Sequence, residues 1–355
     1  MKTPAAATRS AERERSRQRR LGILALFGLT AVWGTTFVVI KGAVATLLPG
    51  SLILARFGLA GLALLPIFGR HARSPGAWRA GFELGALSWL GYTTQAIGLT
   101  STTASRSAFI TSLSVMLVPA LAGLAGRRVS RRVYAAAALA LLGVGLLSWD
   151  GLSPGRGELW TLACALTYAV YVLRLETAAL RLDTRALVLT QIWGVLPFAL
   201  IWSAFEARQA GVGRGMAADL AARSGLPLPL AELLAGLPAH WLAVPGAAWL
   251  AVAYLALAAT ALATSLQTYG QRRVAAPEAA LIYTSEPVWA AVLAAPILGE
   301  RLGGRGWLGA GMILAATLYG QRRPARRDAE ALAATGDGDD GRVSARPGRR
   351  LRFRG

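Results

Sequence analysis

The stretch Thr284-Ser285-Glu286-Pro287-Val288, followed through apolar residues by Gly299-Glu300-Arg301-Leu302, decides the fold class. It places one carboxylate, Glu286, beside a proline inside a long apolar segment. An ionisable residue inside a membrane helix is a candidate functional residue, because burying its charge in hydrocarbon costs free energy. Pro287 has no backbone N–H, so a helix that contains it is expected to bend. The pattern predicts a membrane helix that is both charged and bent, a combination that indicates transport.

The rest of the chain has the same apolar character. Of its 355 residues, 54% are hydrophobic and 16% are charged. The charges gather in two tails and in short loops, and the apolar runs between them match the roughly 20 residues that a helix needs to cross a bilayer. In lipid, only helices and closed barrels pair all their backbone polar groups, and these runs are too long and too continuously apolar for barrel strands. The predicted fold class is all-α integral membrane protein.

Ten transmembrane helices are predicted, with short loops between most of them. Their ranges are 21–42, 50–69, 80–99, 106–125, 133–149, 157–174, 186–205, 246–267, 278–298 and 306–321. Residues 1–20 form a basic N-terminal tail, and residues 323–355 form a polar C-terminal tail that is expected to be disordered. The loop 206–245 is long and contains three prolines, and a surface helix is expected near Leu230 to Leu234.

Arginines indicate the orientation of the chain. The loops on the side of the N-terminus hold most of them, whereas the opposite loops hold few, so the positive-inside rule places both termini in the cytoplasm. The net charge of +20 comes almost entirely from arginines that alternate with membrane spans, which disfavours a nucleic-acid-binding protein. The Arg-heavy, Ala/Gly/Leu-rich composition is typical of a GC-rich genome, and the expected location is a bacterial inner membrane.

The two halves of the chain resemble each other. A shift of 173 residues (284 minus 111) aligns Thr111-Ser112-Leu113-Ser114-Val115 with Thr284-Ser285-Glu286-Pro287-Val288 and places Gly126 on Gly299. The predicted repeats are residues 21–150 and 151–322, with five helices each. Because five is odd, the second repeat inserts upside down, and two inverted five-helix repeats around a central site are typical of secondary transporters.

Several short motifs resemble those of the EamA-like branch of the drug/metabolite transporter superfamily. They are Trp33-Gly34-Thr35-Thr36-Phe37 with Lys41, Ala55-Arg56-Phe57, Tyr92-Thr93-Thr94-Gln95 with Gly98-Leu99, Thr103-Ala104-Ser105-Arg106-Ser107-Ala108-Phe109, Glu286-Pro287-Val288, and Gly299-Glu300-Arg301-Leu302 with Gly309. The resemblance covers about Leu21 to Gln321. It implies a secondary transporter that moves a small-molecule substrate, exporting amino acids or related compounds by alternating access. One departure is Gly126-Arg127-Arg128, where the family often has a glutamate after the glycine.

Three charged residues in or beside the spans are candidate substrate-binding residues. Glu286 is expected either to face a central cavity and bind a cationic group or a proton, or to be tied to a neighbouring helix at the kink. Arg56 is expected either to hold a substrate carboxylate or to satisfy carbonyls and lipid phosphates. Lys41 stands at the outer end of its span, where it is an interface anchor or a ligand.

Four uncharged residues complete the candidate set. Trp33 and Phe37 are four residues apart, so they share a helix face and either line a cavity or pack. Tyr92 and Gln95 are polar groups in mid-span that are suited to bind a substrate or to join helices by hydrogen bonds.

The sequence offers few residues for metal binding, phosphate binding or catalysis. Both histidines, His71 and His240, fall in loops, and no metal-spaced cluster or phosphate-binding motif is present in the sequence. The sequence therefore predicts no cofactor, no bound metal and no enzymatic activity, with transport either passive or coupled to an ion such as the proton. Two alternatives stay open, a multi-span membrane enzyme and a membrane scaffold or sensor that uses its basic tails.

Overall fold

The computed structural model describes residues 4–102, 104–148, 155–211, 214–232, 235, 241, 244–289, 292 and 303–321. These residues are helical or lie in turns, and no strand occurs among them. Residues Met1–Gly320 form one compact unit. The predicted disordered tail, 323–355, and the residues Gly299-Glu300-Arg301-Leu302 lie outside the described part of the chain.

Six helical segments are long and apolar enough to cross a membrane. They span Glu12–Ala43, Pro49–Arg73, Ser107–Leu124, Arg156–Arg181, Thr184–Gln209 and Ala248–Gln271. Three further predicted spans are present as the helices α3 (Ala77–Ser101), α6 (Arg131–Ser148) and α15 (Gly304–Gln321). The predicted span 278–298 begins within α13 (Ala276–Tyr283) and is described only to residue 289 and at 292. The described residues therefore contain six candidate membrane spans, while the count of ten stays a prediction.

The first helix is much longer than its predicted span. α1 (Pro4–Ala43) continues through the basic tail, where Ala, Glu and Arg favour helix. Beyond the apolar part, Arg19 forms an ion pair with Glu278 of α13 at 2.8 Å. Arg273 donates a hydrogen bond from Nε to Gln18 at 2.9 Å. The tail is thus partly an extension of the first span that contacts the second repeat.

The predicted single span 106–125 is interrupted. α4 (Ala104–Ser112) ends, Leu113 lies in a turn, and α5 (Ser114–Leu124) follows. The Ser112 hydroxyl donates to the Ala108 carbonyl oxygen at 2.8 Å, a bond that competes with the backbone ladder and bends helices.

The corresponding segment of the second repeat is also interrupted, close to the equivalent place. α13 ends at Tyr283, Thr284 and Ser285 form a turn, and helix resumes at Glu286. Pro287 has no N–H to donate to the carbonyl of Tyr283, which explains the predicted bend. The shift of 173 residues places the turn at Thr284 and Ser285 on Thr111 and Ser112, directly before the turn at Leu113, so the two breaks lie within two residues of each other in the aligned repeats.

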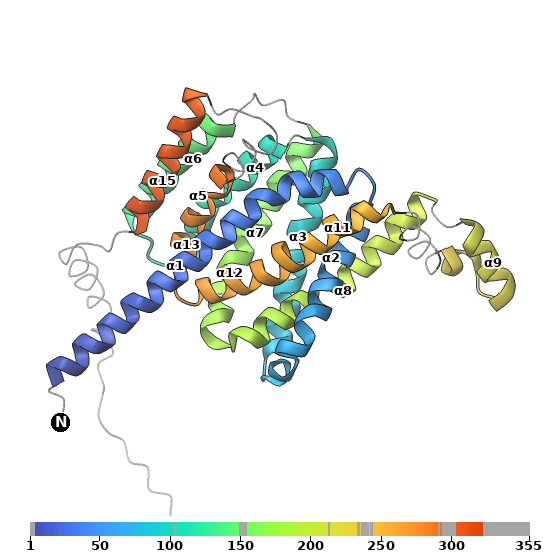
Figure 1. Cartoon of the computed structure of the whole chain (residues 1–355), viewed down its shortest axis with the longest axis horizontal. Helices are drawn as coiled ribbons and strands as arrows, with labels where there is room; N and C mark the ends of the chain where they lie inside the picture. The colour runs from blue at the N-terminus through green and yellow to red at the C-terminus, as the bar shows by residue number, and fades with distance from the viewer. Residues whose placement is uncertain are drawn as a thin grey trace, which may run out of the picture. The chain divides into compact units, whose positions relative to one another are not determined.

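Four helices form the tightly packed centre of one side of the bundle. They are α2 (Pro49–Phe68), α3, α7 (Arg156–Arg181) and α8 (Thr184–Gln209), and Figure 1 shows them side by side. α3 and α8 approach closely at glycines, because a Cβ added to Gly85 would lie 2.4 Å from the backbone carbon of Gly194. Such close backbone contact is typical of membrane helix pairs with small residues at the interface.

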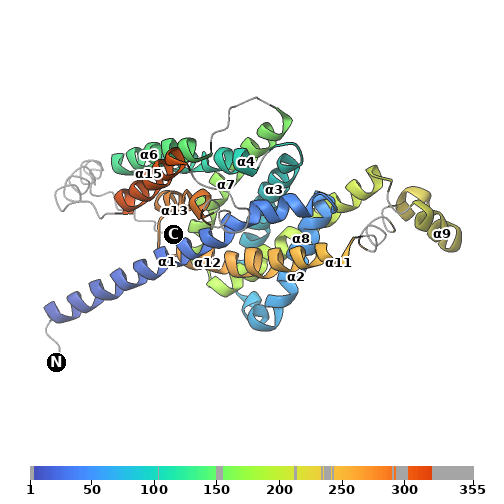
Figure 2. The same ribbon diagram turned by 45° about the horizontal axis from the view of Figure 1, so that its top comes forward.

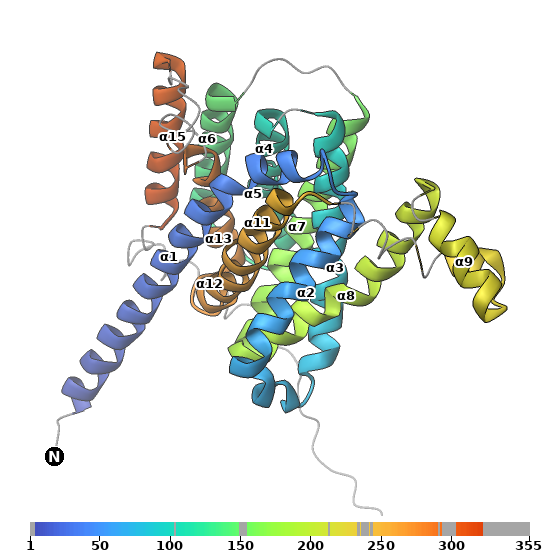
Figure 3. The ribbon, with the colours of Figure 1, turned by 45° about the vertical axis from the view of Figure 1, so that its right-hand side comes forward.

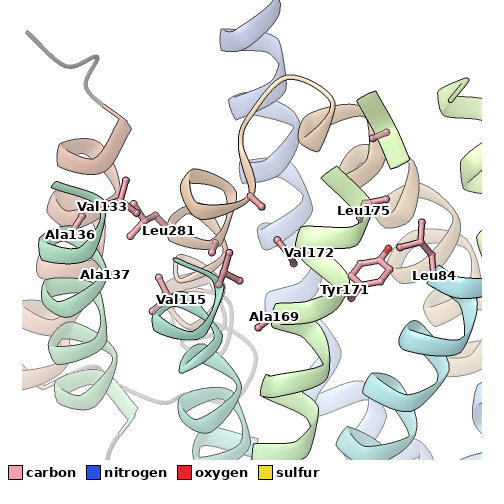
Figure 4. Close-up of a cluster of buried hydrophobic side chains, with 14 of the residues drawn as sticks. Leu84, Val115, Val133, Ala136, Ala137, Ala169, Tyr171, Val172, Leu175 and Leu281 are labelled. Atoms are coloured by element: carbon pink, nitrogen blue, oxygen red, sulfur yellow. The ribbon is translucent and has the colours of Figure 1, made fainter. Parts of the chain in front are cut away.

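The largest apolar cluster joins α5, α6, α7 and α13. In Figure 4, Leu281 of α13 extends toward Val133 and Ala136 of α6, and Val115 of α5 lies on the neighbouring helix. Further along the same face of α6, Gly143 lies against α15, since a Cβ there would be 2.8 Å from the carbonyl oxygen of Gly309. Figures 2 and 3 show α6 and α15 side by side. Gly143 therefore serves a contact within the chain.

The long loop 206–245 is partly helical. α9 (Arg214–Ser224) was not expected, and helix over residues 228–232 overlaps the expected surface helix near Leu230. Ala217 packs with Ala231 and Ala235 in a small apolar cluster.

The predicted eighth span, 246–267, has three parts. α11 (Gly246–Ala256) passes into the π-helical segment η2 (Leu257–Leu262) and then into α12 (Ala263–Gln271). The short 3₁₀ turn η1 (Gly69–Arg73) ends α2. π-helical turns are rare and are frequent at functional sites.

Candidate functional site

A cavity of about 60 Å³ lies where the two interrupted helices meet α1, α3, α7 and α12. Its volume is well above the roughly 10–15 Å³ that one water molecule needs. Both halves of the chain contribute to its wall. The first half supplies Trp33, Thr36, Phe37, Tyr92, Gln95, Ala108, Thr111, Ser112 and Ser114, and the second supplies Tyr168, Val172, Gln267, Ala280, Tyr283, Thr284, Glu286 and Pro287.

Glu286 is the charged residue on this wall. Within the described part of the chain it makes no hydrogen bond and no ion pair. The turn that carries it is held by its neighbours, because Ser285 shares a hydrogen bond of 2.9 Å with Thr30, and Thr284 donates to the Leu281 carbonyl oxygen at 2.6 Å. Among the described residues, this carboxylate therefore has no counter-charge, and the choice between its two predicted roles stays open.

Aromatic side chains from both halves face each other in the cavity. Trp33 packs against Tyr283 with ring centroids 5.6 Å apart, and Tyr92 packs edge-on against Tyr168 at 5.7 Å. The indole Nε1 of Trp33 is buried and has no hydrogen-bond partner.

The structure brings five of the seven predicted site residues to the cavity wall. They are Glu286, Gln95, Tyr92, Trp33 and Phe37. Their part in binding a substrate stays a prediction.

The sequence analysis did not identify a series of hydrogen-bonded polar side chains that begins at the cavity wall. Gln267 and Tyr283 lie on the wall, and Gln267 Nε2 donates to the Tyr283 hydroxyl at 3.5 Å. The Tyr171 hydroxyl lies 3.3 Å from Gln267 Oε1 and donates to Gln191 Oε1 at 2.8 Å. These polar residues stand in mid-span, the same signal that singled out Gln95, so the sequence contained the information to find them.

Arg56 lies outside the cavity wall, behind Tyr92. It is 1% exposed. Its Nε donates to Thr260 Oγ1 at 2.9 Å and its Nη2 to the Ala259 carbonyl oxygen at 3.1 Å, both in η2. Its guanidinium carbon lies 4.6 Å from the centroid of the Tyr92 ring, a cation–π contact.

Lys41 is also away from the cavity. Its Nζ donates to the Thr102 carbonyl oxygen at 2.8 Å, beyond the last residue of α3. This contact ties the ends of α1 and α3 together and fits the anchor interpretation of Lys41.

Other reactive groups in the described residues form no further site. No group of three or more His, Cys, Asp and Glu side chains there is arranged to hold a metal ion. Cys164 is buried, and His71 lies 3.2 Å from Arg185 at the end of the bundle.

Comparison with known proteins gives a consistent result. The model of the EamA-like transporter family matches residues 20–149 and 155–319, one match for each half of the chain. An uncharacterized transporter of Archaeoglobus fulgidus is 35% identical over 151 residues, which cover 42% of this chain and 46% of that relative, so the match spans about half its length. A solved crystal structure shares the fold with a TM-score of 0.60 and 18% identity, covering 84% of this chain and 97% of the other.

Proposed function

The chain belongs to the EamA-like transporter family, and from this membership we propose that it is a secondary transporter that exports small metabolites such as amino acids or related compounds. The observation that carries the proposal is the cavity to which both repeats contribute, with Glu286 on its wall and without a partner among the described residues. A carboxylate without a described partner inside a helical bundle costs free energy, and binding of a substrate or a proton would offset that cost.

Two features support alternating access between the repeats. The family matches cover residues 20–149 and 155–319, and both matched segments contribute residues to the cavity wall. The interruptions at Leu113 and at Thr284–Ser285, which lie within two residues of each other in the aligned repeats, give each repeat a broken helix beside the cavity. Broken helices of this kind carry substrate sites near the midplane in transporters, and inverted repeats supply two mirror-related conformations.

Glu286 is proposed to bind either a cationic group of the substrate or a coupling proton. Both would neutralise its charge, which reduces the free-energy cost of holding a carboxylate among apolar side chains. Trp33, Phe37, Tyr92 and Gln95 would surround the bound molecule. The protein is further proposed to reside in a bacterial inner membrane with both termini in the cytoplasm, as the arginine distribution predicts.

The proposal is tested by growth of cells that express the chain or carry an empty vector, in the presence of toxic amino-acid analogues, dipeptides and cationic drugs. Protection against one chemical class, lost in Glu286→Gln at equal expression, is the expected result. Asp219→Asn is the matched control, because Asp219 is an exposed carboxylate on α9, away from the cavity. Sensitisation would indicate uptake in place of export, and no effect from well-inserted protein would count against transport of these classes.

A further inference from the structure

Arg56 is a buried cation without an anion. Its two hydrogen bonds go to neutral oxygens, the Thr260 hydroxyl and the Ala259 carbonyl. No ion pair in the described part of the chain involves it, and its Nη1 is buried without any partner. Burying an unpaired guanidinium is costly, and each unmet donor adds to the cost. The described residues therefore leave Arg56 without an ion-pair partner and its Nη1 without an acceptor.

The neighbours of Arg56 occupy most of the space around its guanidinium group. Nε and Nη2 are held by η2, and the Phe57 ring lies 5.6 Å from the guanidinium carbon. The Tyr92 ring covers the guanidinium at 4.6 Å, and Tyr92 is itself part of the cavity wall. One aromatic side chain thus lies between the unpaired cation and the cavity.

Tyr92 also lies within electrostatic range of Glu286 on its cavity side. The cavity region therefore contains one acidic and one basic side chain, neither of which forms an ion pair with a described residue. An acidic and a basic side chain without ion-pair partners match a ligand that carries both a cationic and an anionic group. A planar guanidinium with a free Nη1 fits one oxygen of a carboxylate.

We propose that Arg56 is the anion-binding half of the substrate site and that the substrate is zwitterionic, with an ammonium group at Glu286 and a carboxylate at Arg56. Tyr92 moves off the guanidinium when the substrate binds and covers Arg56 when the site is empty, through the cation–π contact observed here. This inference rests on the proposed transport function and specifies its substrate class.

A purely structural role for Arg56 does not explain why the buried side chain carries a charge. If Arg56 only fastened α2 to η2, the bonds from Nε and Nη2 would suffice, and an uncharged donor would provide them without the cost of a buried charge. The π-helical geometry of η2 is also explained, because it presents the Ala259 carbonyl and the Thr260 hydroxyl to the guanidinium together.

The test compares three matched ligand series on the purified full-length protein in lipid nanodiscs, with the shift in Tm as the readout. The series are free amino acids, the corresponding amino-acid amides, which lack the carboxylate, and the corresponding deaminated carboxylic acids. At least one amino acid is expected to raise the Tm more than its amide and more than its deaminated acid. Arg56→Gln is expected to weaken amino-acid binding about 10- to 100-fold and to leave the amide unchanged.

Two further variants separate binding from folding. Arg56→Lys keeps the charge but loses the planar fork, so it is expected to fold and to bind the amino acid more weakly than the wild type. Arg131→Gln, at the exposed start of α6, is the control and is expected to bind as the wild type does.

Three results would overturn the inference. These are equal binding of amino acids and amides by the wild type, discrimination retained in Arg56→Gln, and no Tm shift with any carboxylate. Binding of amines or amides alone would remove the anion site and leave a transporter of cationic compounds. The growth panel judges the transport function independently, so failure of the two proposals can be told apart.

Discussion

Arg127 and Glu176 form a bidentate ion pair that joins the two repeats. Nη1 and Nη2 of Arg127 donate to the two carboxylate oxygens of Glu176 at 2.5 and 2.9 Å. Arg127 follows the end of α5 in the first family match, and Glu176 lies near the end of α7 in the second. The hydrogen bonds with Glu176 raise the pKa of Arg127 above its ordinary value. Because a raised pKa in a base stabilises the fold below that ordinary value, the contribution is present at neutral pH and is lost only in strong alkali.

Arg127→Ala is expected to lower the free energy of unfolding by about 1–3 kcal/mol, because it leaves the Glu176 carboxylate, 8% exposed, without its partner. The value is below that of a fully buried pair, since the Arg127 side chain is 41% exposed and screened by solvent. The measurement is thermal unfolding in detergent, with Arg131→Ala as the exposed control. The double variant Arg127→Glu with Glu176→Arg should recover part of the loss, and a Tm for Arg127→Ala equal to that of the control would contradict the prediction.

Gly85→Ala is expected to destabilise the protein, because its added Cβ would lie 2.4 Å from the backbone carbon of Gly194 and 2.7 Å from its Cα. Backbone atoms cannot rotate away as side chains do, so α3 and α8 must separate, and overpacking of this kind costs about 1–3 kcal/mol or more. Gly58→Ala on α2 is the matched control, since nothing lies within 4 Å of a Cβ there. Tm and monodispersity after purification are measured, and equal behaviour of the two variants would show that α3 and α8 pack differently.

The fold class was predictable because the solvent imposes it. Long apolar runs leave helices as the structure that pairs every backbone group, and the described residues are helical. The family assignment from short motifs is confirmed by matches to both halves of the chain. The bend at Pro287 was predictable from chemistry, because proline removes a donor. The break at Leu113 was not, since no proline stands beside it. The Ser112 hydroxyl, which donates to the Ala108 carbonyl oxygen, lies at the end of α4 just before it.

The site was predictable in its residue types and only partly in its geometry. Polar residues in mid-span identified Glu286, Tyr92 and Gln95, which the structure places on one cavity wall. The location of Arg56 behind Tyr92 depends on how α2 is rotated about its axis. In lipid, both the outer and the inner faces of a helix are apolar, so the hydrophobic period does not show which face points inward.

Deletion of residues 324–355 is expected to leave transport unchanged. The family match ends at residue 319 and the compact unit at Gly320, so the segment lies beyond the helices that form the cavity. A scaffold or sensor that acts through its basic tail would lose its activity in the same variant. The growth panel measures this with expression matched by immunoblot, and loss of protection in the truncated but well-inserted protein would favour the scaffold hypothesis.

Glu286→Gln is expected to abolish accumulation driven by a proton gradient while keeping downhill exchange of substrate in proteoliposomes. The amide has nearly the same shape as the protonated acid, so the cavity stays formed, but it can neither release nor take up a proton. If Glu286 binds an ammonium group in place of a proton, the variant instead loses affinity for substrate in both assays, because the carboxylate is the one charged group on the described wall. The two outcomes therefore assign different roles to the same residue. Asp219→Asn should match the wild type in both assays, and a Glu286→Gln protein with wild-type accumulation and affinity would remove Glu286 from the mechanism.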